Sequence, residues 1–303
     1  MSDLKEKIKT SVDRIQRFSP ITDYYSDKGE KGYYLAFSGG KDSVVVKRLM
    51  DMAGVKYDAH YRITSVDPPE LYRFIKNQHP DVQMDYPRDK YGEVVTMWNL
   101  IPQKMMPPTR KVRYCCEYLK ETGGNDRFVV TGVRWAESVN RKKNQGIITA
   151  PDGGIEGEGF VETDRGGTIL VNDNTDARSE IEECPTLHKL LLNPIVDWTD
   201  ADVWEFIRAE KIPYCELYDE GFARLGCIGC PMAKQHGRER EFFRWPKYRA
   251  AYLKSFDKML QERWRRGKLD SSWRMGTTAQ DVFRWWMEYD TLPGQIDWFE
   301  DEY

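Results

Sequence analysis

The chain has 303 residues, of which 40% are hydrophobic and 31% are charged, a composition typical of a soluble globular protein with one elaborated domain or two modules. Its formal net charge of -3 provides no general attraction to nucleic acid. No apolar run approaches the roughly 20 residues of a membrane span, and the mixed-charge start "MSDLKEKIKTSVDRIQRF" lacks the apolar core of a signal peptide. The sequence therefore predicts a cytoplasmic protein with no membrane partner.

The first half of the chain alternates strand-like and helical patterns. Residues 1–30 predict an N-terminal helix followed by a polar connection. Strands are expected at about 33–37, 55–63, 82–86 and 127–133, with helices at about 41–52 and 68–80. Alternation of this kind is typical of a parallel sheet that helices cover on both faces. We therefore predict an α/β fold built on a twisted parallel sheet.

The alternation stops at about residues 142–184. This stretch is rich in glycine, and it holds ten acidic but only two basic residues between Asp152 and Glu183. We expect an insertion that forms a hairpin or a mobile lid, with a disordered segment as the alternative.

The last third of the chain is predicted to be largely helical. A strand-like run "LLLNPIV" leads into a helix that Thr199 caps, with two aspartates in its first turn. Residues 234–268 predict a basic helical region, and "TAQDVFRWWMEYD" predicts a last helix. We therefore divide the chain into an N-terminal helix (1–30), an α/β domain (31–232) and a helical C-terminal region (233–303).

The sequence "SGGKDS" at residues 38–43 lies where an apolar strand ends and a helix begins. Glycine lets the backbone approach a ligand closely, and the N–H groups of a helix N-terminus favour negative charge. Lys41 adds a positive charge, while Ser38 and Ser43 add hydroxyl donors. The spacing differs from the P-loop of common nucleotidases, which has four residues between its glycines. We expect this 38–43 loop to bind a pyrophosphate, sulfate or phosphosulfate group, and a tight turn with a helix cap is the alternative.

The same loop carries a resemblance to known proteins. "SGGKDS" resembles the signature of the PP-loop superfamily of adenine nucleotide alpha hydrolases. Four later stretches are similar, in the same order, to motifs of the phosphoadenosine phosphosulfate (PAPS) reductase family: "ITSVDPPELYRFI", "TGVRWAESVNR", "NPIVDWTDADVWEFI" and "LYDEGFARLGCIGC". The resemblance spans about residues 31–232, and it implies an enzyme of sulfur metabolism that binds an adenine nucleotide.

The resemblance also implies where the nucleotide binds. Its base and ribose would contact the backbone near Ala36, Thr64 and Gly132, at the carboxyl ends of the strands. Its anionic end would lie against Gly39 and Gly40. The nucleotide is ATP, or else PAPS or adenylyl sulfate, and Mg²⁺ is a candidate companion of ATP.

Charged residues near this loop are the candidate catalytic group. Lys41, Asp42 and Arg134 are expected to be catalytic. Arg134 and Arg141 suit an anion because a guanidinium donates two parallel hydrogen bonds, and Glu137 would orient one of them. A surface network of ion pairs is the alternative interpretation of these charges.

Six cysteines are present, at positions 115, 116, 184, 215, 227 and 230. An adjacent pair and a C-x-x-C favour metal or redox chemistry over disulfides in a protein of this size. Cys115, Cys116, Cys227 and Cys230 match the arrangement of the iron–sulfur subgroup of sulfonucleotide reductases, which implies a 4Fe–4S cluster. Zinc is the alternative metal, and Cys184 is an alternative ligand.

One feature of the reductases is missing from this sequence. They attack their substrate with a cysteine near the C-terminus, whereas no cysteine follows Cys230 here. A reductase reaction would then need an external thiol, or Cys184 or Cys215 as the nucleophile. Proteins of the family without that tail include DNA phosphorothioation enzymes, in which ATP activates an acceptor.

We therefore hypothesise ATP-dependent sulfur transfer to an acceptor, with a cysteine desulfurase or a thioredoxin-like protein as the sulfur donor. The alternatives are a sulfonucleotide reductase and a non-catalytic sensor that binds a nucleotide and a cluster.

Residues 234–268 hold twelve basic and four acidic residues. Aromatic residues interleave with them: Phe242, Phe243, Trp245, Tyr248, Tyr252, Phe256 and Trp264. Basic side chains with aromatic neighbours can follow a phosphate backbone and stack on bases. A helix that packs its aromatics inward and exposes its lysines gives the same pattern. DNA or RNA is therefore a candidate partner.

Overall fold

The computed structural model describes residues 2–25, 29–174, 176–182, 189–268, 273 and 275–288. Its centre is an eight-stranded sheet with the strand order β3-β2-β1-β4-β8-β5-β7-β6. Five strands are parallel: β3 (Gln83–Asp85), β2 (Tyr57–Arg62), β1 (Tyr33–Ala36), β4 (Phe128–Val130) and β8 (Leu190–Leu192). Three more strands continue the sheet in antiparallel pairing: β5 (Ile148–Ala150), β7 (Thr168–Leu170) and β6 (Phe160–Glu162).

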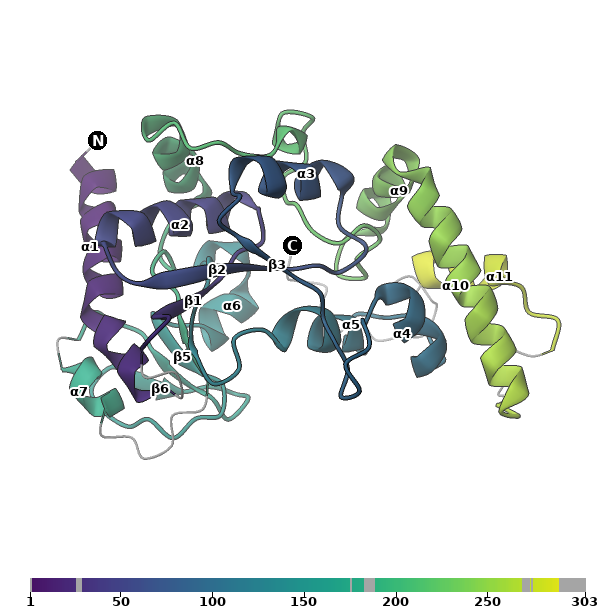
Figure 1. The fold of residues 1–303 in the computed structure, drawn as a ribbon, viewed down its shortest axis with the longest axis horizontal. Coiled ribbons are helices and arrows are strands. Elements are labelled where there is room, and N and C mark those ends of the chain that lie inside the picture. Colours follow the sequence, from purple (N-terminus) through teal and green to yellow (C-terminus); the bar gives the residue numbers. More distant parts are fainter. Residues whose placement is uncertain are drawn as a thin grey trace.

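Helices cover this sheet on both faces. Successive residues of a strand point to opposite faces, and all three residues of β4 are buried. Both faces must therefore be covered at the centre of the sheet, as is usual for parallel strands. The predicted α/β class with a helical C-terminal region is confirmed (Figure 1).

The helices follow in chain order: α1 (Ser2–Phe18), α2 (Lys41–Ala53), α3 (Pro69–Gln78), α4 (Met97–Lys104), α5 (Tyr114–Cys116), α6 (Val139–Asn144), α7 (Ala177–Glu182), α8 (Asp200–Ala209), α9 (Gln235–Arg244), α10 (Pro246–Arg265) and α11 (Ala279–Glu288). Short turns of other helical types are η1 (Ser19–Tyr24), η2 (Glu117–Glu121), η3 (Trp135–Glu137) and η4 (Glu216–Tyr218). Helix α2 contacts both α1 and α8, so these three helices form one layer (Figure 1).

The strand order changes direction between β1 and β4. The chain runs from β1 outward through β2 to β3, and it then returns to the other side of β1 as β4. In open α/β sheets, ligands bind beside the carboxyl ends of the strands at such a switch point. The 38–43 loop leaves β1 and opens α2 at this point.

The stretch at residues 142–184 extends the sheet. Strands β6 and β7 form an antiparallel hairpin, and β5 joins this hairpin to β8. Three of its glycines, Gly153, Gly154 and Gly159, have a positive φ of 71° to 85°, which other residues rarely adopt. The described part of the acidic insertion is therefore ordered structure at the edge of the sheet. Cys184 lies outside the described residues.

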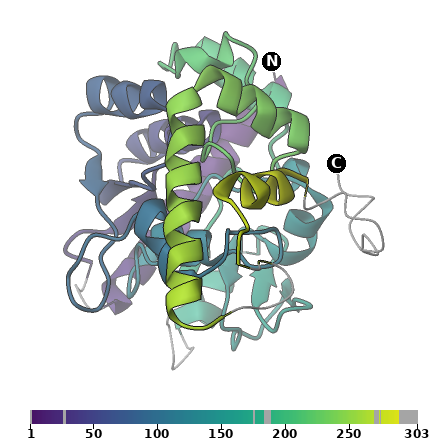
Figure 2. The same ribbon diagram turned by 90° about the vertical axis from the view of Figure 1, so that its right-hand side faces the viewer.

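The C-terminal helices α9, α10 and α11 lie at the end of the molecule opposite α1 (Figures 1 and 2). Their aromatic residues form a common core, in which the ring of Trp286 lies 4.7 Å from that of Tyr252 and 5.4 Å from that of Phe256. Phe242 and Trp245 are each only 6% exposed. The idea that this aromatic set stacks on bases is therefore wrong, because most of these rings pack inward. Tyr248 and Trp264 are partly buried, and Phe243 has 91% of its surface exposed.

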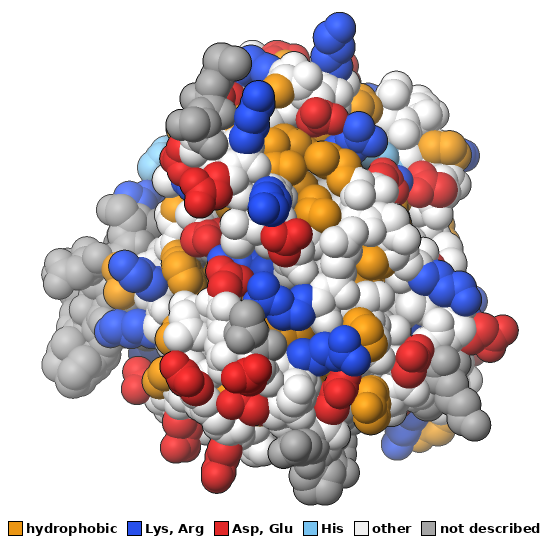
Figure 3. Space-filling view, turned by 90° about the vertical axis from the view of Figure 1, so that its left-hand side faces the viewer, with side chains coloured by type: hydrophobic (Ala, Val, Ile, Leu, Met, Phe, Trp, Pro, Cys, Tyr) orange, Lys and Arg blue, Asp and Glu red, His pale blue; other side chains and the backbone are white. Residues whose placement is uncertain are grey.

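On the end of the molecule that carries α1, acidic and basic side chains are interspersed (Figure 3). Such mixing agrees with a net charge close to zero. Throughout the described ranges, the helices fall short of the length and apolarity that a bilayer span requires.

Candidate functional site

Glycine is required at the first turn of the 38–43 loop. Gly39 has a φ of +72°, and a Cβ there would lie within 2.8 Å of Leu71 and Ile75 on α3. Gly40 caps α2 with an extended backbone. The loop is therefore pressed against α3 while it directs the first N–H groups of α2 toward the switch point.

The two serines of the loop brace it internally. The Ser43 hydroxyl donates to the carbonyl of Gly40 at 2.9 Å, and the Ser38 hydroxyl donates to Ser43 Oγ at 3.3 Å. The N–H of Gly40 points toward Ser38 Oγ at 3.4 Å. Ser38 is exposed whereas Ser43 is buried, so Ser43 fixes the loop and Ser38 faces outward.

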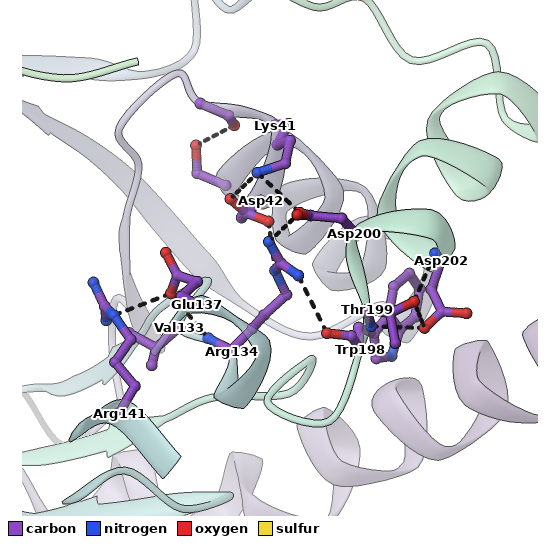
Figure 4. A network of polar contacts seen from close by, with 12 residues as sticks. Lys41, Asp42, Val133, Arg134, Glu137, Arg141, Trp198, Thr199, Asp200 and Asp202 are labelled. Atoms are coloured by element: carbon purple, nitrogen blue, oxygen red, sulfur yellow. Dashed lines mark hydrogen bonds and ion pairs between the residues drawn. The ribbon is translucent and has the colours of Figure 1, made fainter. Parts of the chain in front are cut away.

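A network of two cations and two carboxylates adjoins the loop (Figure 4). Lys41 Nζ lies 3.3 Å from Asp42 Oδ2 and 3.3 Å from Asp200 Oδ1. Arg134 Nε lies 2.7 Å from Asp42 Oδ1, and its Nη2 lies 2.7 Å from Asp200 Oδ1. Arg134 Nη1 donates to the carbonyl of Trp198 at 3.2 Å. Arg134 is only 1% exposed, so these partners occupy a guanidinium that we expected to bind an anion directly.

Three separate elements supply this network. Lys41 and Asp42 begin α2, Arg134 precedes η3 after β4, and Asp200 begins α8. Gly132 lets the β4 segment come close, because a Cβ there would lie 3.1 Å from Asp42 Cβ. The sequence did not reveal the role of Asp200, because an acidic residue in the first turn of a helix is already explained by the helix dipole.

Asp200 remains ionised in this setting. Burial on its own would raise the pKa of Asp200, but the charges of Lys41 and Arg134 outweigh burial and hold that pKa below its ordinary value. Its side chain is 70% exposed, whereas the side chain of Asp42 is 21% exposed. The site therefore presents an exposed carboxylate beside the positive end of a helix.

Arg141 lies among other cations. Its Nε is 3.1 Å from Glu137 Oε2, and the same carboxylate accepts a hydrogen bond from the Arg134 backbone N–H at 3.2 Å (Figure 4). Burial lowers the pKa of Arg141, Glu137 raises it, and Arg224 and Arg113 lower it further. The three guanidinium groups of Arg141, Arg224 and Arg113 repel one another electrostatically. An anion bound among them would relieve this repulsion. We did not single out Arg224 in the sequence.

The expected nucleotide contacts follow three adjacent strands. Ala36 ends β1, Thr64 follows β2 and Gly132 follows β4. Thr64 is 1% exposed, and its backbone N–H donates to Asp67 Oδ2 at 2.9 Å. These residues therefore share one edge of the sheet, the edge that also carries the 38–43 loop.

The second cysteine pair forms a turn beside Thr64. Cys227 Sγ lies 3.6 Å from Thr64 Oγ1, and the N–H of Cys230 donates to the carbonyl of Cys227 at 3.2 Å. Gly229 has a φ of +72°, and a Cβ there would lie 2.6 Å from the ring of Phe242. The turn is therefore held between β2 and the C-terminal helices.

The first pair lies on α5 close to this turn. A hydrogen bond between the two thiols raises the pKa of Cys115 and lowers the pKa of Cys116. The guanidinium of Arg113, whose Nη2 lies 3.5 Å from Cys116 Sγ, lowers the pKa of Cys116 further. Cys227 and Cys230 also act electrostatically on Cys115. All four predicted ligands therefore lie in one neighbourhood.

Another cation, Lys120, faces the same neighbourhood. In its thiolate form, Cys227 raises the pKa of Lys120 more than any other group does. Nothing in the sequence singled out this lysine. Cys215, by contrast, is fully buried in the hydrophobic core.

In the described ranges, no group of three or more potential ligand side chains lies close enough to hold a single metal ion. A mononuclear zinc site needs that closeness, since all its ligands bind one ion at about 2.3 Å. A cubane cluster binds each thiolate to a different iron and keeps the sulfurs farther apart.

Comparison with known proteins defines the family. Residues 32–233, more than half of the chain, match the family model of the phosphoadenosine phosphosulfate reductase domain. The chain therefore belongs to this family of nucleotide-binding PP-loop enzymes, as its motifs predicted.

The chain also aligns with several relatives. Two uncharacterized proteins of Methanocaldococcus jannaschii are 26% and 25% identical over 73% and 98% of this chain. The chain spans 42% and 62% of the lengths of these two relatives. The adenosine 5'-phosphosulfate reductase of Pseudomonas aeruginosa is 26% identical over 68% of this chain and 70% of its own length.

Solved structures align more distantly. The FMN adenylyltransferase of Candida glabrata, in complex with FAD and inorganic pyrophosphate, has a TM-score of 0.43 and 16% identity over 75% of this chain and 64% of its own. The PAPS reductase of Candida auris has a TM-score of 0.40 and 14% identity over 75% of this chain and 95% of its own.

The geometry predicts that Lys41→Ala and Ser43→Ala each weaken nucleotide binding while the protein stays folded. Lys41→Ala removes the cation that faces both carboxylates, and Ser43→Ala removes the brace on Gly40. The loss of one charge-assisted hydrogen bond should cost about 1.5–3 kcal/mol of binding free energy. Calorimetric titration with ATP and with PAPS measures this loss.

Lys47→Ala on the same helix is the control, because Lys47 pairs with Asp81 at 2.9 Å and not with the loop. Unchanged affinity in both loop variants would show that the 38–43 loop does not bind the anionic end.

Proposed function

We propose that the chain is an ATP-dependent enzyme that activates an acceptor for sulfur incorporation. An oxygen of the acceptor bonds to the α-phosphorus of ATP, the bond to the bridging oxygen breaks, and pyrophosphate leaves with the electron pair. A sulfur nucleophile, supplied by a donor protein, then displaces AMP from the acceptor. Family membership supports the nucleotide, and the site's own residues support the choice of ATP.

The main support for ATP is the pair of carboxylates, Asp42 and Asp200, beside the 38–43 loop that we expect to bind an anion. Lys41 and Arg134 balance the charges of Asp42 and Asp200, so the network offers no net positive charge to a sulfonucleotide that binds by its negative charges alone. ATP, in contrast, binds proteins together with Mg²⁺, and carboxylate and phosphate oxygens are its usual ligands. The two side chains are acidic, adjacent and partly exposed, so they fit that ion. When bound, Mg²⁺ would neutralise charge on the departing pyrophosphate.

The remaining residues have distinct roles in this proposal. The N–H groups of the 38–43 loop and Lys41 hold the pyrophosphate end. Arg134 orients Asp42 and Asp200, since it touches both and has almost no exposed surface. Arg141, with its cationic neighbours, stabilises charge on the α-phosphate. The backbone near Ala36 and Thr64 receives the adenosine.

We also propose that the four gathered cysteines hold a 4Fe–4S cluster. Lys120 and Arg113 would offset the negative charge of thiolate ligands. All five cysteines of the described residues are free thiols, which suits a reducing cytoplasm. Such a cluster, when bound, would supply sulfur handling or electron transfer beside the nucleotide.

A nucleic acid remains our candidate for the acceptor. Lys254, Lys258 and Arg265 follow Lys247 by 7, 11 and 18 residues on α10. At about 100° per residue these four cations share one line along the helix, about 27 Å long. Within the described ranges, the three lysines have no ion-pair partner, and the row lies opposite the buried aromatic face. Such a row can follow a phosphate backbone without stacking on bases.

A sulfonucleotide reductase is the second candidate function. The similarity to the Pseudomonas aeruginosa adenosine 5'-phosphosulfate reductase, over most of both chains, favours it. That reaction would require a thiol from a partner protein, and it would release sulfite instead of pyrophosphate.

Turnover by anaerobically purified protein separates the two candidates. ATP with Mg²⁺, adenylyl sulfate with a thiol, and PAPS with a thiol are compared side by side. We expect pyrophosphate from ATP, with a rate at least about tenfold lower in Asp200→Asn. Asp202→Asn is the matched control, because Asp202 caps the same helix and pairs with Lys7, not with Lys41 or Arg134. Sulfite release without pyrophosphate would replace our proposal with the reductase.

The cluster has its own test. Anaerobically purified protein should be brown, contain iron and acid-labile sulfide, and lose its colour in air. Cys227→Ser combined with Cys230→Ser should abolish iron binding, whereas Cys215→Ala should keep it because Cys215 lies in the core. Zinc in stoichiometric amount without iron, or iron retained in the double variant, would contradict the proposed cluster.

The lysine row predicts binding to DNA or RNA that weakens steeply with salt, because each neutralised phosphate releases counterions. Charge reversal at Lys247, Lys254 and Lys258 should flatten the salt dependence, while reversal at Lys5 and Lys9 on α1 should not. Arg263 is unsuitable for this test, since it is 6% exposed and donates to the carbonyl of Met105 at 2.8 Å. Gel shifts across a salt series measure the effect, and no shift at low salt would exclude a nucleic acid on α10.

A further inference from the structure

Tyr218 reaches the 38–43 loop from a distant part of the chain. It ends η4, which lies between α8 and the cysteine turn. Its ring meets the ring of Trp204 edge-on at 5.2 Å and that of Tyr214 at 6.3 Å. This aromatic packing fixes the direction of the phenol, so its hydroxyl has a defined position.

That position is the N-terminus of α2. The hydroxyl oxygen accepts a hydrogen bond from the backbone N–H of Lys41 at 2.8 Å. A Cβ on Gly40 would lie 3.4 Å from the same oxygen. The phenol therefore lies against the part of the loop where we place the pyrophosphate end, and it uses one of the amides that a helix N-terminus leaves without an internal partner.

The proton of this hydroxyl is available to a ligand. Across the described residues, the only hydrogen bond found at this oxygen is the one that it accepts from Lys41. Burial raises the pKa of Tyr218 above its ordinary value, the bond from Lys41 lowers it, and the charge of Asp42 raises it. The phenol is thus neutral near pH 7, and it can donate one hydrogen bond while it accepts another.

We propose that Tyr218 binds the pyrophosphate end of the nucleotide, accepting from the Lys41 N–H and donating its own proton to a phosphate oxygen. This assignment rests on the proposed function, since it places a polyphosphate in the 38–43 loop. The amide polarises the O–H that it bonds to, which strengthens donation to an anion. The phenol thereby extends the donor set of the loop by one bond that the "SGGKDS" motif does not contain.

Calorimetric titration of pyrophosphate, ATP and AMP into the purified full chain tests the assignment. Tyr218→Phe should weaken the binding of pyrophosphate and ATP about tenfold, because one bond to a charged oxygen is lost. AMP, which lacks the β- and γ-phosphates, should bind as in the wild type. Tyr214→Phe is the control, since the hydroxyl of Tyr214 donates to Asp219 at 3.1 Å and not to the 38–43 loop.

A melting curve of each variant separates binding from folding. If Tyr218 only capped α2, the phenylalanine variant would melt earlier with unchanged pyrophosphate affinity, and the proposal would be overturned.

The same titration separates this proposal from the proposed function. If the wild type binds pyrophosphate and ATP and Tyr218→Phe weakens both, but ATP is not cleaved, the activity fails and the role of Tyr218 stands. If the wild type cleaves ATP and Tyr218→Phe binds pyrophosphate normally, the role of Tyr218 fails alone. If the wild type binds neither ligand, both are wrong.

Discussion

The site depends on one buried guanidinium. Arg134 is held between Asp42 and Asp200, so a single side chain joins the first turn of α2, the segment after β4 and the first turn of α8. A charge with so little contact with water is stable only where its partners are in place. The ion pairs therefore fix the relative positions of the loop and of both carboxylates before any ligand arrives. This preorganisation is what an enzyme needs if charge is to be stabilised without rearrangement.

The segment after β2 links the neighbourhood of the 38–43 loop to the turn that carries Cys227 and Cys230. Thr64 follows β2 beside the loop, and its hydroxyl lies 3.6 Å from the sulfur of Cys227. The next link is a hydrogen bond of 2.8 Å from the N–H of Ile228 to the carbonyl of Val66. Two sites with different chemistry thus share one edge of the sheet.

Much of this arrangement could be predicted from the sequence, for reasons that differ between residues. Hydrophobic runs predicted the strand before the loop and the helix after it, and the structure has β1 and α2 there. The glycine pair predicted a tight turn, and Gly39 has a positive φ. The role of Asp200 was hidden because the helix dipole already explains an acidic residue in the first turn of a helix. Tyr218 was hidden because its contact with Lys41 joins residues 177 positions apart. The aromatic residues of 234–268 were ambiguous because burial, which decides their role, is a property of the fold. Trp286, the centre of their core, lies beyond that segment.

The turn at Gly229 determines where the chain could be truncated without loss of the cysteine turn. The family resemblance ends at residue 233, yet the ring of Phe242 and that of Trp286 fill the space in which a side chain at position 229 would stand. Tyr252 adds a hydrogen bond of 3.0 Å to the carbonyl of Ile228. A chain cut where the shared motifs stop would keep Cys227 and Cys230 but lose the surface on which their turn rests. The packing of the cysteine turn therefore depends on helices that lie beyond the family domain of residues 32–233.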